Sequence, residues 1–486
     1  MNEILNLEPK QIWANFSKLN EVPRPSKKEE KVREFMIAFG KSLNLETLTD
    51  QIGNVIIKKP ASSGMENRKT VVLQSHLDMV HQKNNDVDFD FATQGIQMYV
   101  DADGFVKAKG TTLGADNGIG VATIMAVLES TEIQHPAIKA LFTIDEETGM
   151  TGAIGLDESI LNGEILLNLD TEEDDELTMG CAGGLDVTAV KSYQSENLNG
   201  EFTSIRVDVK GLKGGHSGGD IHLGLGNSNK LLARFLNESL LFQAQIASMD
   251  SGSLRNAIPR EGHFVISVPN AEVQNLKSAF ESLKNDIHIE FQSIEPNLNI
   301  QISEVEFQNS VASKNDTRQF TLALMSAYNG VYRMSPEIEG LTETSNNVAN
   351  VVVENGEMKI LCLTRSALES NKKLLSEILK STFELAGFEV NFSGGYPGWR
   401  PNTNSEILKL MEKIYKEIFN ESPKISATHG GLECGIIGGH YPELDMISFG
   451  PNIYGAHSPD ERVEIKSVQK FWKYFLEVLK QTPEKN

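Results

Sequence analysis

The 486-residue sequence predicts an α/β domain with a mostly parallel central sheet, into which a second, α+β domain is inserted. The chain is longer than one compact core usually accommodates. Up to about residue 183, short β-branched runs alternate with helical segments, which is typical of a parallel sheet. Between about 184 and 396 the strands are instead grouped around helices, and the α/β alternation returns after 397. We therefore expect a discontinuous domain, 1–183 and 397–486, with 184–396 inserted.

The first part contains short apolar runs with the length and β-branched content of buried strands. A helix is expected over KKEEKVREFMIAFGKSL, because Ser26 followed by Glu29 has the form of a capping box. A second helical segment, IGVATIMAVLEST, lies farther along the chain. The last part predicts helices at 404–419 and 466–482 around a strand DMISFG. The expected strands of the first part are NVIIKK, TVVLQ, AIKALFTI and EILLNL.

The inserted part repeats one arrangement of elements. Helices are expected at 226–240 and 271–286 among the strands FTSIRVDVK, HFVISVP and HIEFQSI. A second set follows, with helices at 317–328 and 370–386 and strands NVANVVVE, EMKILCLT and FEVNFS. Two such rounds predict two ferredoxin-like lobes.

Composition excludes several classes of protein. Lys and Arg number 45 against 67 Asp and Glu, so the net charge is −22, which disfavours nucleic acid and anionic membranes as partners. The three cysteines are far apart and form no CxxC pair, as expected for reduced thiols. No apolar run approaches the ~18 residues of a membrane span, and MNEILNLEPKQIW has no leader pattern. We expect a cytoplasmic protein.

Charged side chains collect where the predicted parallel strands end. In an open parallel sheet, ligands bind beyond the carboxyl ends of the strands. Taken singly, each of these residues has an ordinary explanation, such as a helix N-cap for Asp116 or a solvated loop for DTEEDDE. Together they would repel one another unless a cation were bound. The residues are His76, Asp78, Asp116, Asp145, Glu146, Glu147, Asp170 and His457.

Imidazole and carboxylate ligands without thiolates suit Zn²⁺, with Mn²⁺ or Co²⁺ as substitutes. The number of carboxylates is sufficient for two metal ions that share one bridging ligand. The sequence therefore predicts a metal centre at this edge of the sheet.

A series of motifs resembles, in order and nearly end to end, the bacterial aminoacyl-histidine dipeptidases. These are carnosinase-like members of the di-zinc aminopeptidase, carboxypeptidase and aminoacylase superfamily. The resemblance implies a cytosolic metallopeptidase with a catalytic domain and a lid. The motifs are SHLDMV, GTTLGADNGIG, DEETGMTGA, NLDTEED, GCAGG, GGHSGGDIHLGLGN, SLRNAIPRE, HGGLECG and SFGPNIYGAHSPDE.

The resemblance also implies roles for individual residues. His76 and Asp170 would hold one zinc, Glu147 and His457 the other, and Asp116 would bridge them. Asp78 would orient His76, and Glu146 would be the general base that accepts the proton of a zinc-activated water. The peptide bond after the bridging acid, Asp116–Asn117, would be cis.

The lid would supply the substrate-binding groups. His216 resembles a histidine that supports the oxyanion, while Asn256 and Arg365 resemble residues that bind the substrate backbone and carboxylate. Gly430 and Gly431 resemble the loop that receives the free carboxylate. The expected substrates are dipeptides, preferentially Xaa-His such as β-alanyl-histidine. A broad-specificity dipeptidase or an aminoacylase is the alternative, and the choice between monomer and homodimer stays open.

Two readings from other classes remain. Gly215 to Gly219 satisfy GxSxG, the nucleophile elbow of serine hydrolases, with Ser217 as nucleophile. The expected strand ends near Lys210 and the helix starts near residue 226, whereas an elbow needs both next to the serine. A metal-binding protein without turnover would be expected to lack Glu146, which is present.

Overall fold

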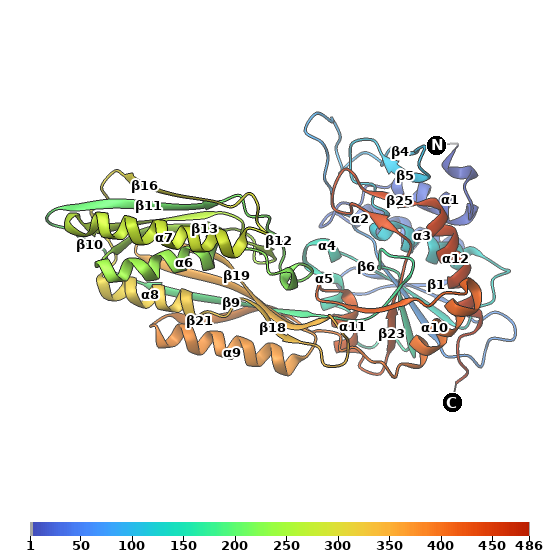
Figure 1. The fold of residues 1–486 in the computed structure, drawn as a ribbon. Helices are drawn as coiled ribbons and strands as arrows, with labels where there is room; N and C mark the ends of the chain where they lie inside the picture. Colours follow the sequence, from blue (N-terminus) through green and yellow to red (C-terminus); the bar gives the residue numbers. More distant parts are fainter. Residues whose placement is uncertain (1–2, 486) are drawn as a thin grey trace. The chain divides into compact units, whose positions relative to one another are not determined.

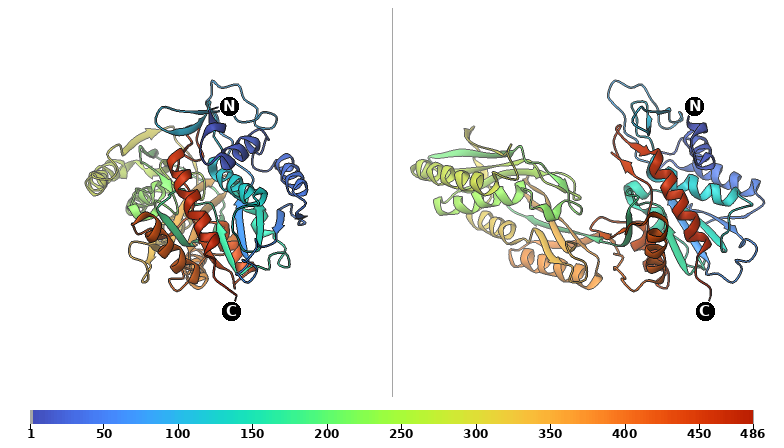
Figure 2. Two further views of the ribbon diagram at one scale, coloured as in Figure 1. Left: turned by 90° about the vertical axis from the view of Figure 1, so that its right-hand side faces the viewer. Right: turned by 45° about the vertical axis from the view of Figure 1, so that its right-hand side comes forward.

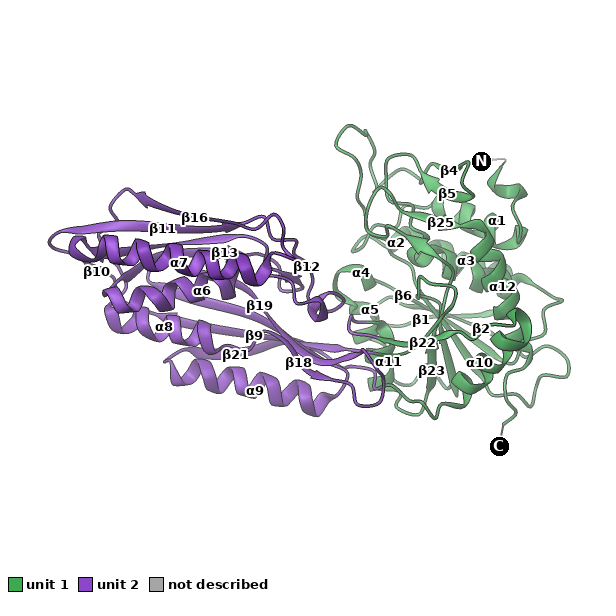
Figure 3. Ribbon diagram, viewed as in Figure 1, with its two compact units in different colours: residues 1–180, 401–427, 432–486 green, residues 181–400, 428–431 purple. Residues whose placement is uncertain are grey.

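The structure is a computed structural model that describes residues 3–485, so the first two residues of MNEILNLEPKQIW lie outside the described part. It divides into two compact units (Figure 3). Unit 1 comprises Met1–Gly180, Pro401–Ala427 and Leu432–Asn486, and unit 2 comprises Cys181–Arg400 and Thr428–Gly431. No helix among the described residues is long and apolar enough to cross a membrane.

The bounds of unit 2 extend beyond the expected 184–396 because of backbone pairing at its base. Cys181 and Trp399 exchange two N–H···O bonds of 2.9 Å, and the N–H of Ala182 donates to the carbonyl oxygens of Thr428 and Gly430. Residues 428–431, which the sequence analysis placed in the other domain, are thus grouped with unit 2.

Unit 1 contains an eight-stranded sheet with the order β1-β2-β6-β3-β7-β23-β8-β22. Strands β1, β6 and β23 of this sheet are labelled in Figure 1. The central pairs β6–β3, β3–β7 and β7–β23 are parallel, which confirms the predicted α/β sheet. These strands are almost wholly buried, and their apolar runs reflect that burial. The bounds are β1 Glu46–Thr49, β2 Val55–Lys59, β3 Val71–His76, β6 Ile138–Thr143, β7 Ile165–Asn168, β8 Glu176–Cys181, β22 Lys424–Thr428 and β23 Asp445–Ser448.

The helices of unit 1 pack around this sheet (Figure 2). Helix α3 (Ala115–Glu129) packs on β3 and is covered by α1 (Lys10–Asn20). Nearly all of its residues are buried, which explains a sequence that is apolar on every side. A small sheet of the order β24-β25-β5-β4 completes the unit. The other elements are α2 Glu30–Ser42, α4 Glu146–Gly149, α5 Thr151–Ile154, α10 Glu406–Phe419, α11 Glu433–His440, α12 Ile465–Lys480, β4 Met98–Val100, β5 Phe105–Ala108, β24 Ile453–Tyr454 and β25 Arg462–Glu464.

Unit 2 is built on one long antiparallel sheet with the order β16-β11-β15-β13-β19-β20-β9-β21. Its first half runs β11, α6, β13, β15, α7, β16, and its second half β9, α8, β19, β20, α9, β21. Each half therefore has the βαββαβ order of a ferredoxin-like lobe, as predicted. The bounds are β9 Gly183–Ser192, β11 Phe202–Lys210, β13 Gln245–Gly252, β15 Gly262–Pro269, β16 Asn299–Val305, β19 Thr342–Glu354, β20 Glu357–Ser366, β21 Glu389–Tyr396, α6 Ser228–Ser239, α7 Val273–Phe291, α8 Lys314–Ser326 and α9 Glu369–Leu385.

The two lobes are joined by the antiparallel pair β13–β19, from Met249↔Val353 to Gly252↔Asn350. Their helices and strands share a single hydrophobic core. One expected strand was wrong: HIEFQSI begins inside α7, and β16 starts at Asn299. Leu276, Phe280 and Ile287 are buried at helical spacing along α7, and this apolar face overrides the β-branched content of the segment.

Candidate metal centre

The strand pairing of unit 1 brings the predicted residues to one edge. His76 ends β3, whose register places it beside Thr143 of β6 and places Gln74 beside Asn168 of β7. Glu146 follows β6, and Asp170 follows β7. Since all three strands are parallel, the loops at their carboxyl ends lie side by side, as the sequence analysis expected.

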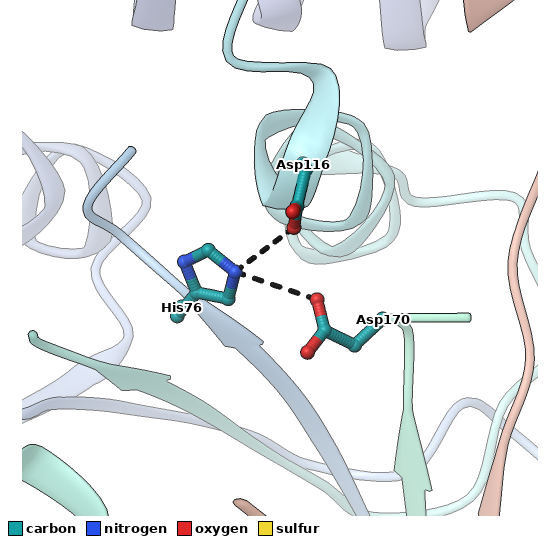
Figure 4. Close-up of side chains that lie close together, drawn as sticks. All are labelled: His76, Asp116 and Asp170. Atoms are coloured by element: carbon teal, nitrogen blue, oxygen red, sulfur yellow. Dashed lines mark hydrogen bonds and ion pairs between the residues drawn. The ribbon is translucent and has the colours of Figure 1, made fainter. Parts of the chain in front are cut away.

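His76 contacts two carboxylates through one ring nitrogen (Figure 4). Its Nε2 lies 3.1 Å from Oδ1 of Asp116 and 3.4 Å from Oδ1 of Asp170. The ring itself is buried. The ligand atoms of the three residues lie within 4.8 Å of one another, which is a spacing that one metal ion could span.

A second set of ligand atoms shares Asp116. Nε2 of His457 lies 2.9 Å from Oε2 of Glu147 and 3.4 Å from Oδ2 of Asp116. The two oxygens of Asp116 therefore face two different histidines. His457 has a φ of +67°, a left-handed conformation that costs energy in a non-glycine residue and is concentrated at functional sites. The peptide bond Asp116–Asn117 is cis, as expected.

Asp78 lies behind His76 and contacts three other groups. Its Oδ1 is 3.4 Å from Nδ1 of His76, and its two oxygens accept the backbone N–H groups of Glu146 and Glu147 at 3.0 and 3.3 Å. The hydroxyl of Ser26 donates to Oδ2 at 2.8 Å. The capping role predicted for Ser26 is therefore wrong, since α2 begins at Glu30 and Ser26 contacts Asp78 instead. Asp78 orients both His76 and the turn that carries the two glutamates.

The electrostatics of the site fit a divalent cation. Although burial opposes it, the carboxylates of Asp170 and Asp116 raise the pKa of His76 well above its ordinary value. Hydrogen bonds to Asp116 and Glu147 raise the pKa of His457 to about 11. Without a metal, protonated imidazoles would help to balance these carboxylates. A hard or borderline divalent ion with nitrogen and oxygen ligands would replace both protons.

Glu146 occupies the same turn as Glu147 but has a different environment. Burial, together with the nearby carboxylates of Asp170 and Glu147, raises the pKa of Glu146 well above its ordinary value. No histidine lies in ion-pair contact with it among the described residues. A carboxyl group in these surroundings is suited to accepting and returning a proton.

Two further acids near the site were missed by the sequence analysis. Glu433 is fully buried, and Gln74 Nε2 and Thr143 Oγ1 each donate to its Oε2 at 2.6 Å. Burial raises the pKa of Glu433 to about 8. Burial, followed by the charges of Asp116 and Asp170, raises the pKa of Glu172 to about 8. Both belong to motifs that carried the resemblance, but only the folded structure places Glu433 against Gln74 and Thr143 and brings Glu172 near the charges of Asp116 and Asp170.

Unit 2 brings together most of the residues predicted to bind substrate. The guanidinium of Arg365 donates to the hydroxyl of Tyr396 at 3.0 Å and lies 3.4 Å from Nε2 of His216. Arg365 is buried, whereas His216 is exposed. The carbonyl of Asn256 accepts the N–H of Ser217 at 2.8 Å, within the same loop region.

The glycine loop of HGGLECG adjoins this cluster. A Cβ on Gly218 would collide with the carbonyl oxygen of His429, so the 215–219 loop packs directly on residue 429. The N–H of Gly430 donates to the hydroxyl of Thr428 at 3.0 Å, and Gly431 ends the segment. His216, Asn256, Arg365, Gly430 and Gly431 therefore all lie in unit 2.

The geometry does not support the serine nucleophile. Ser217 is buried, and its hydroxyl accepts from Nε of Arg365 at 3.3 Å. Its flanking elements are a two-residue strand, β12 (Gly215–His216), and a single 3-10 turn, η2 (Ile221–Leu223). The neighbouring His216 turns its Nδ1 toward the N–H groups of Gly218 and Gly219. The strand and helix that an elbow requires are both missing from this segment.

His429 predicts a pH dependence of stability for unit 2. Its ring is buried, and Nε2 contacts the hydroxyl of Ser345 at 2.7 Å. Burial, followed by the positive charge of Arg365 and the nearby His216 and His222, lowers its pKa to about 3. The unfolded chain binds this proton below its ordinary pKa of 6.5 and the folded chain does not. The contribution of the neutral His429 to stability is therefore fully present above pH 6.5, and it is lost as the pH falls toward 3.

As the pH falls from 6.5 to 5, we expect His429 to lower the free energy of unfolding by about 2 kcal/mol. The measurement compares thermal unfolding of metal-free wild type and His429→Gln at the two pH values. The melting temperature of the wild type should fall further between the two pH values than that of the variant. The variant lacks only the titration of His429, and the titration of every other group is common to both. Equal losses would show that His429 is protonated in the folded state.

Comparisons with known proteins identify the family of the chain. Residues 72–481 match the peptidase family M20/M25/M40. The cytosol non-specific dipeptidase of Escherichia coli (strain K12) is 43% identical over 488 residues, covering 100% of both chains. The crystal structure of aminoacylhistidine dipeptidase from Vibrio alginolyticus superposes with a TM-score of 0.92 at 44% identity, covering 100% of each chain. Aminopeptidase PepT from Bacillus cereus shares the fold at a TM-score of 0.58 and 15% identity, covering 98% of this chain and 99% of its own.

The family match spans most of the chain, and the relative from Escherichia coli aligns along its entire length. The edge of the parallel sheet carries groups of His, Asp and Glu side chains that are close enough to hold a metal ion. The chain therefore belongs to the peptidase family M20/M25/M40 and is a metal-dependent peptidase.

Proposed function

We propose that the chain is a dipeptidase that works with two zinc ions, with Mn²⁺ or Co²⁺ as substitutes. The observation that carries the proposal is the Asp116 carboxylate, whose oxygens face His76 and His457 separately. Each histidine has a carboxylate of its own, Asp170 for His76 and Glu147 for His457. This donor set suits two borderline metals that share one bridging ligand.

A metal bound at this centre would act as a Lewis acid that acidifies a water molecule and polarises the scissile carbonyl. Glu146 accepts the proton of the attacking water and returns it to the leaving amine, so no covalent intermediate is needed. Asp78 keeps Nδ1 of His76 facing it, and this contact leaves Nε2 directed at the centre. Through the N–H groups of Glu146 and Glu147, Asp78 also fixes the turn that carries the base.

We assign substrate binding to residues of unit 2. Arg365 and the Gly430–Gly431 loop would bind the C-terminal carboxylate, Asn256 the substrate backbone, and His216 the oxyanion. A guanidinium is suited to a carboxylate because its N–H groups match the two oxygens. The contact between Arg365 and Tyr396 holds the guanidinium in place.

Histidine preference is the finer part of the proposal. The relative from Vibrio alginolyticus is named for aminoacylhistidine dipeptides, whereas the one from Escherichia coli is named non-specific. A broad-specificity dipeptidase is therefore the second candidate. We also propose a cytosolic location, because the relative from Escherichia coli is named a cytosol dipeptidase.

The test is a substrate panel with zinc-loaded protein: β-alanyl-histidine, alanyl-histidine, alanyl-leucine and alanyl-histidyl-alanine. We expect the dipeptides to be cleaved and the tripeptide to be rejected. A third residue moves the carboxylate outward by ~3.3–3.6 Å, and a buried carboxylate without its partner costs several kcal/mol. Comparable cleavage of the tripeptide would contradict the length limit. Equal rates for leucine and histidine would favour the broad dipeptidase.

A further inference from the structure

The loop that carries Asp116 is held by one carboxylate outside the metal-ligand sets. Oε2 of Glu461 accepts the N–H groups of Leu113 and Gly114 at 2.6 and 2.9 Å. Oε1 accepts those of Ala115 and Asp116 at 2.7 and 3.2 Å. Four consecutive backbone donors thus converge on one buried side chain, which is 2% exposed.

These donors need such a partner because of where they lie. The first N–H groups of a helix have no acceptor within the helix, and α3 begins at Ala115. Gly114 has a φ of +69°, and Asp116 has non-helical backbone angles. A carboxylate at a helix N-terminus is stabilised by the helix dipole and by charge-assisted hydrogen bonds. Glu461 therefore supplies the acceptors that this irregular loop cannot find in its own helix.

Arg24 holds the carbonyl groups of the same region. Its Nη2 donates to the carbonyl oxygen of Gly114 at 2.5 Å, and its Nη1 to those of Leu77 and Asp78 at 3.2 and 3.0 Å. Arg24 is buried, with 1% of the residue exposed. It thereby links the segment that follows His76 to the loop that carries Asp116.

Glu461 also connects two ligands through the chain. It lies four residues after His457, in the loop between β24 and β25. The carboxylate thus ties the loop of His457 to the loop of Asp116, while Arg24 ties the loop of Asp116 to β3. These two buried side chains thus join three of the ligand-bearing segments, those of His76, Asp116 and His457.

We propose that Glu461 and Arg24 are positioning residues that fix the Asp116 carboxylate between the two histidines, so that both metal ions bind tightly. The inference rests on the proposed metal centre. Neither side chain touches substrate or metal in this scheme, and each acts through the backbone of residues 77–78 and 113–116. Changes to groups that orient metal ligands typically cost 10- to 100-fold in metal affinity.

The decisive variants change bonding and keep size. Glu461→Gln retains one acceptor oxygen but turns an NH₂ group toward two backbone N–H groups. Arg24→Lys keeps the charge but loses the planar fork that reaches three carbonyls. Asp460→Asn is the control for the first, because it removes the same charge from the adjacent, exposed residue. Arg68→Lys is the control for the second, since Arg68 also donates to a backbone carbonyl, that of Thr482, at 3.0 Å.

The measurement is the zinc dissociation constant by chelator competition, together with the rise in melting temperature when zinc is added to the metal-free protein. We expect Glu461→Gln and Arg24→Lys to weaken zinc binding by about 10- to 100-fold. Both should show a smaller zinc-induced rise in melting temperature, since ligand stabilisation follows affinity. The controls should match the wild type in both readouts. A purely structural role would lower the melting temperature with and without zinc equally.

A folded variant whose zinc affinity stays within about twofold of the wild type, well short of the tenfold minimum expected, overturns the assignment for that residue. If Glu461→Gln does not fold, Glu461→Asp decides, because its charged but shorter side chain should also weaken zinc binding. Wild-type protein that takes up no zinc would refute the proposed metal centre itself, a result distinct from unchanged affinity in the variants.

Discussion

Glu146→Gln is expected to lower kcat by about 10²- to 10⁴-fold while the protein keeps its fold and its bound metal. The amide has the shape of the carboxyl group but cannot accept the proton of the attacking water. The backbone N–H of residue 146 still donates to Asp78 in the variant, so the turn that carries Glu147 should stay in place. Zinc content and the circular dichroism spectrum should therefore equal those of the wild type.

Glu172→Gln is the matched control for this prediction. Glu172 is a second half-buried acid beside the ligands, and its pKa is raised to about 8. If any nearby carboxyl group could act as the base, the two variants would lose similar activity. We expect Glu172→Gln to retain kcat within a few-fold, well short of the loss from removing a general base. Near-normal turnover in metal-loaded Glu146→Gln, with loss in Glu172→Gln, would transfer the role of base to Glu172.

Much of the fold could be predicted because the sequence pattern is local. The runs TVVLQ, AIKALFTI and EILLNL are short, apolar and β-branched, and they form β3, β6 and β7. Once these strands are taken as parallel, the residues after each of them must share an edge, which brings His76 and Asp170 together without further information. The structure confirms that the two residues are close, since Nε2 of His76 lies 3.4 Å from Oδ1 of Asp170. The roles of metal ligands and base stay predictions.

Other features depend on contacts that no local pattern shows. HIEFQSI has a strand-like composition, but Ile287 faces the core of unit 2 and continues the helix α7. Ser26 and Glu29 have capping-box spacing, yet the serine hydroxyl binds Asp78, 52 positions away in sequence. Glu461 and Arg24 bind backbone N–H and C=O groups, which nearly every residue type possesses, so the residue types of their partners do not reveal the contact.

Asp116→Asn is expected to remove both metal ions, in contrast to Asp170→Asn, which should remove one. Among the described residues, Asp116 is the only one whose two oxygens each lie within ion-pair distance of a different histidine. Of the two histidines, Asp170 contacts only His76, so the His457–Glu147 pair remains intact when Asp170 is changed. Elemental analysis should find about two zinc ions per wild-type chain, about one in Asp170→Asn and less than one in Asp116→Asn, because zinc needs three or more protein ligands to be held. Activity of Asp116→Asn should fall to background, further than the roughly 10- to 100-fold cost of changing a group that only orients a ligand. A full complement of two metals in Asp116→Asn would show that each ion has enough ligands without a shared carboxylate, and it would remove the bridging role from Asp116.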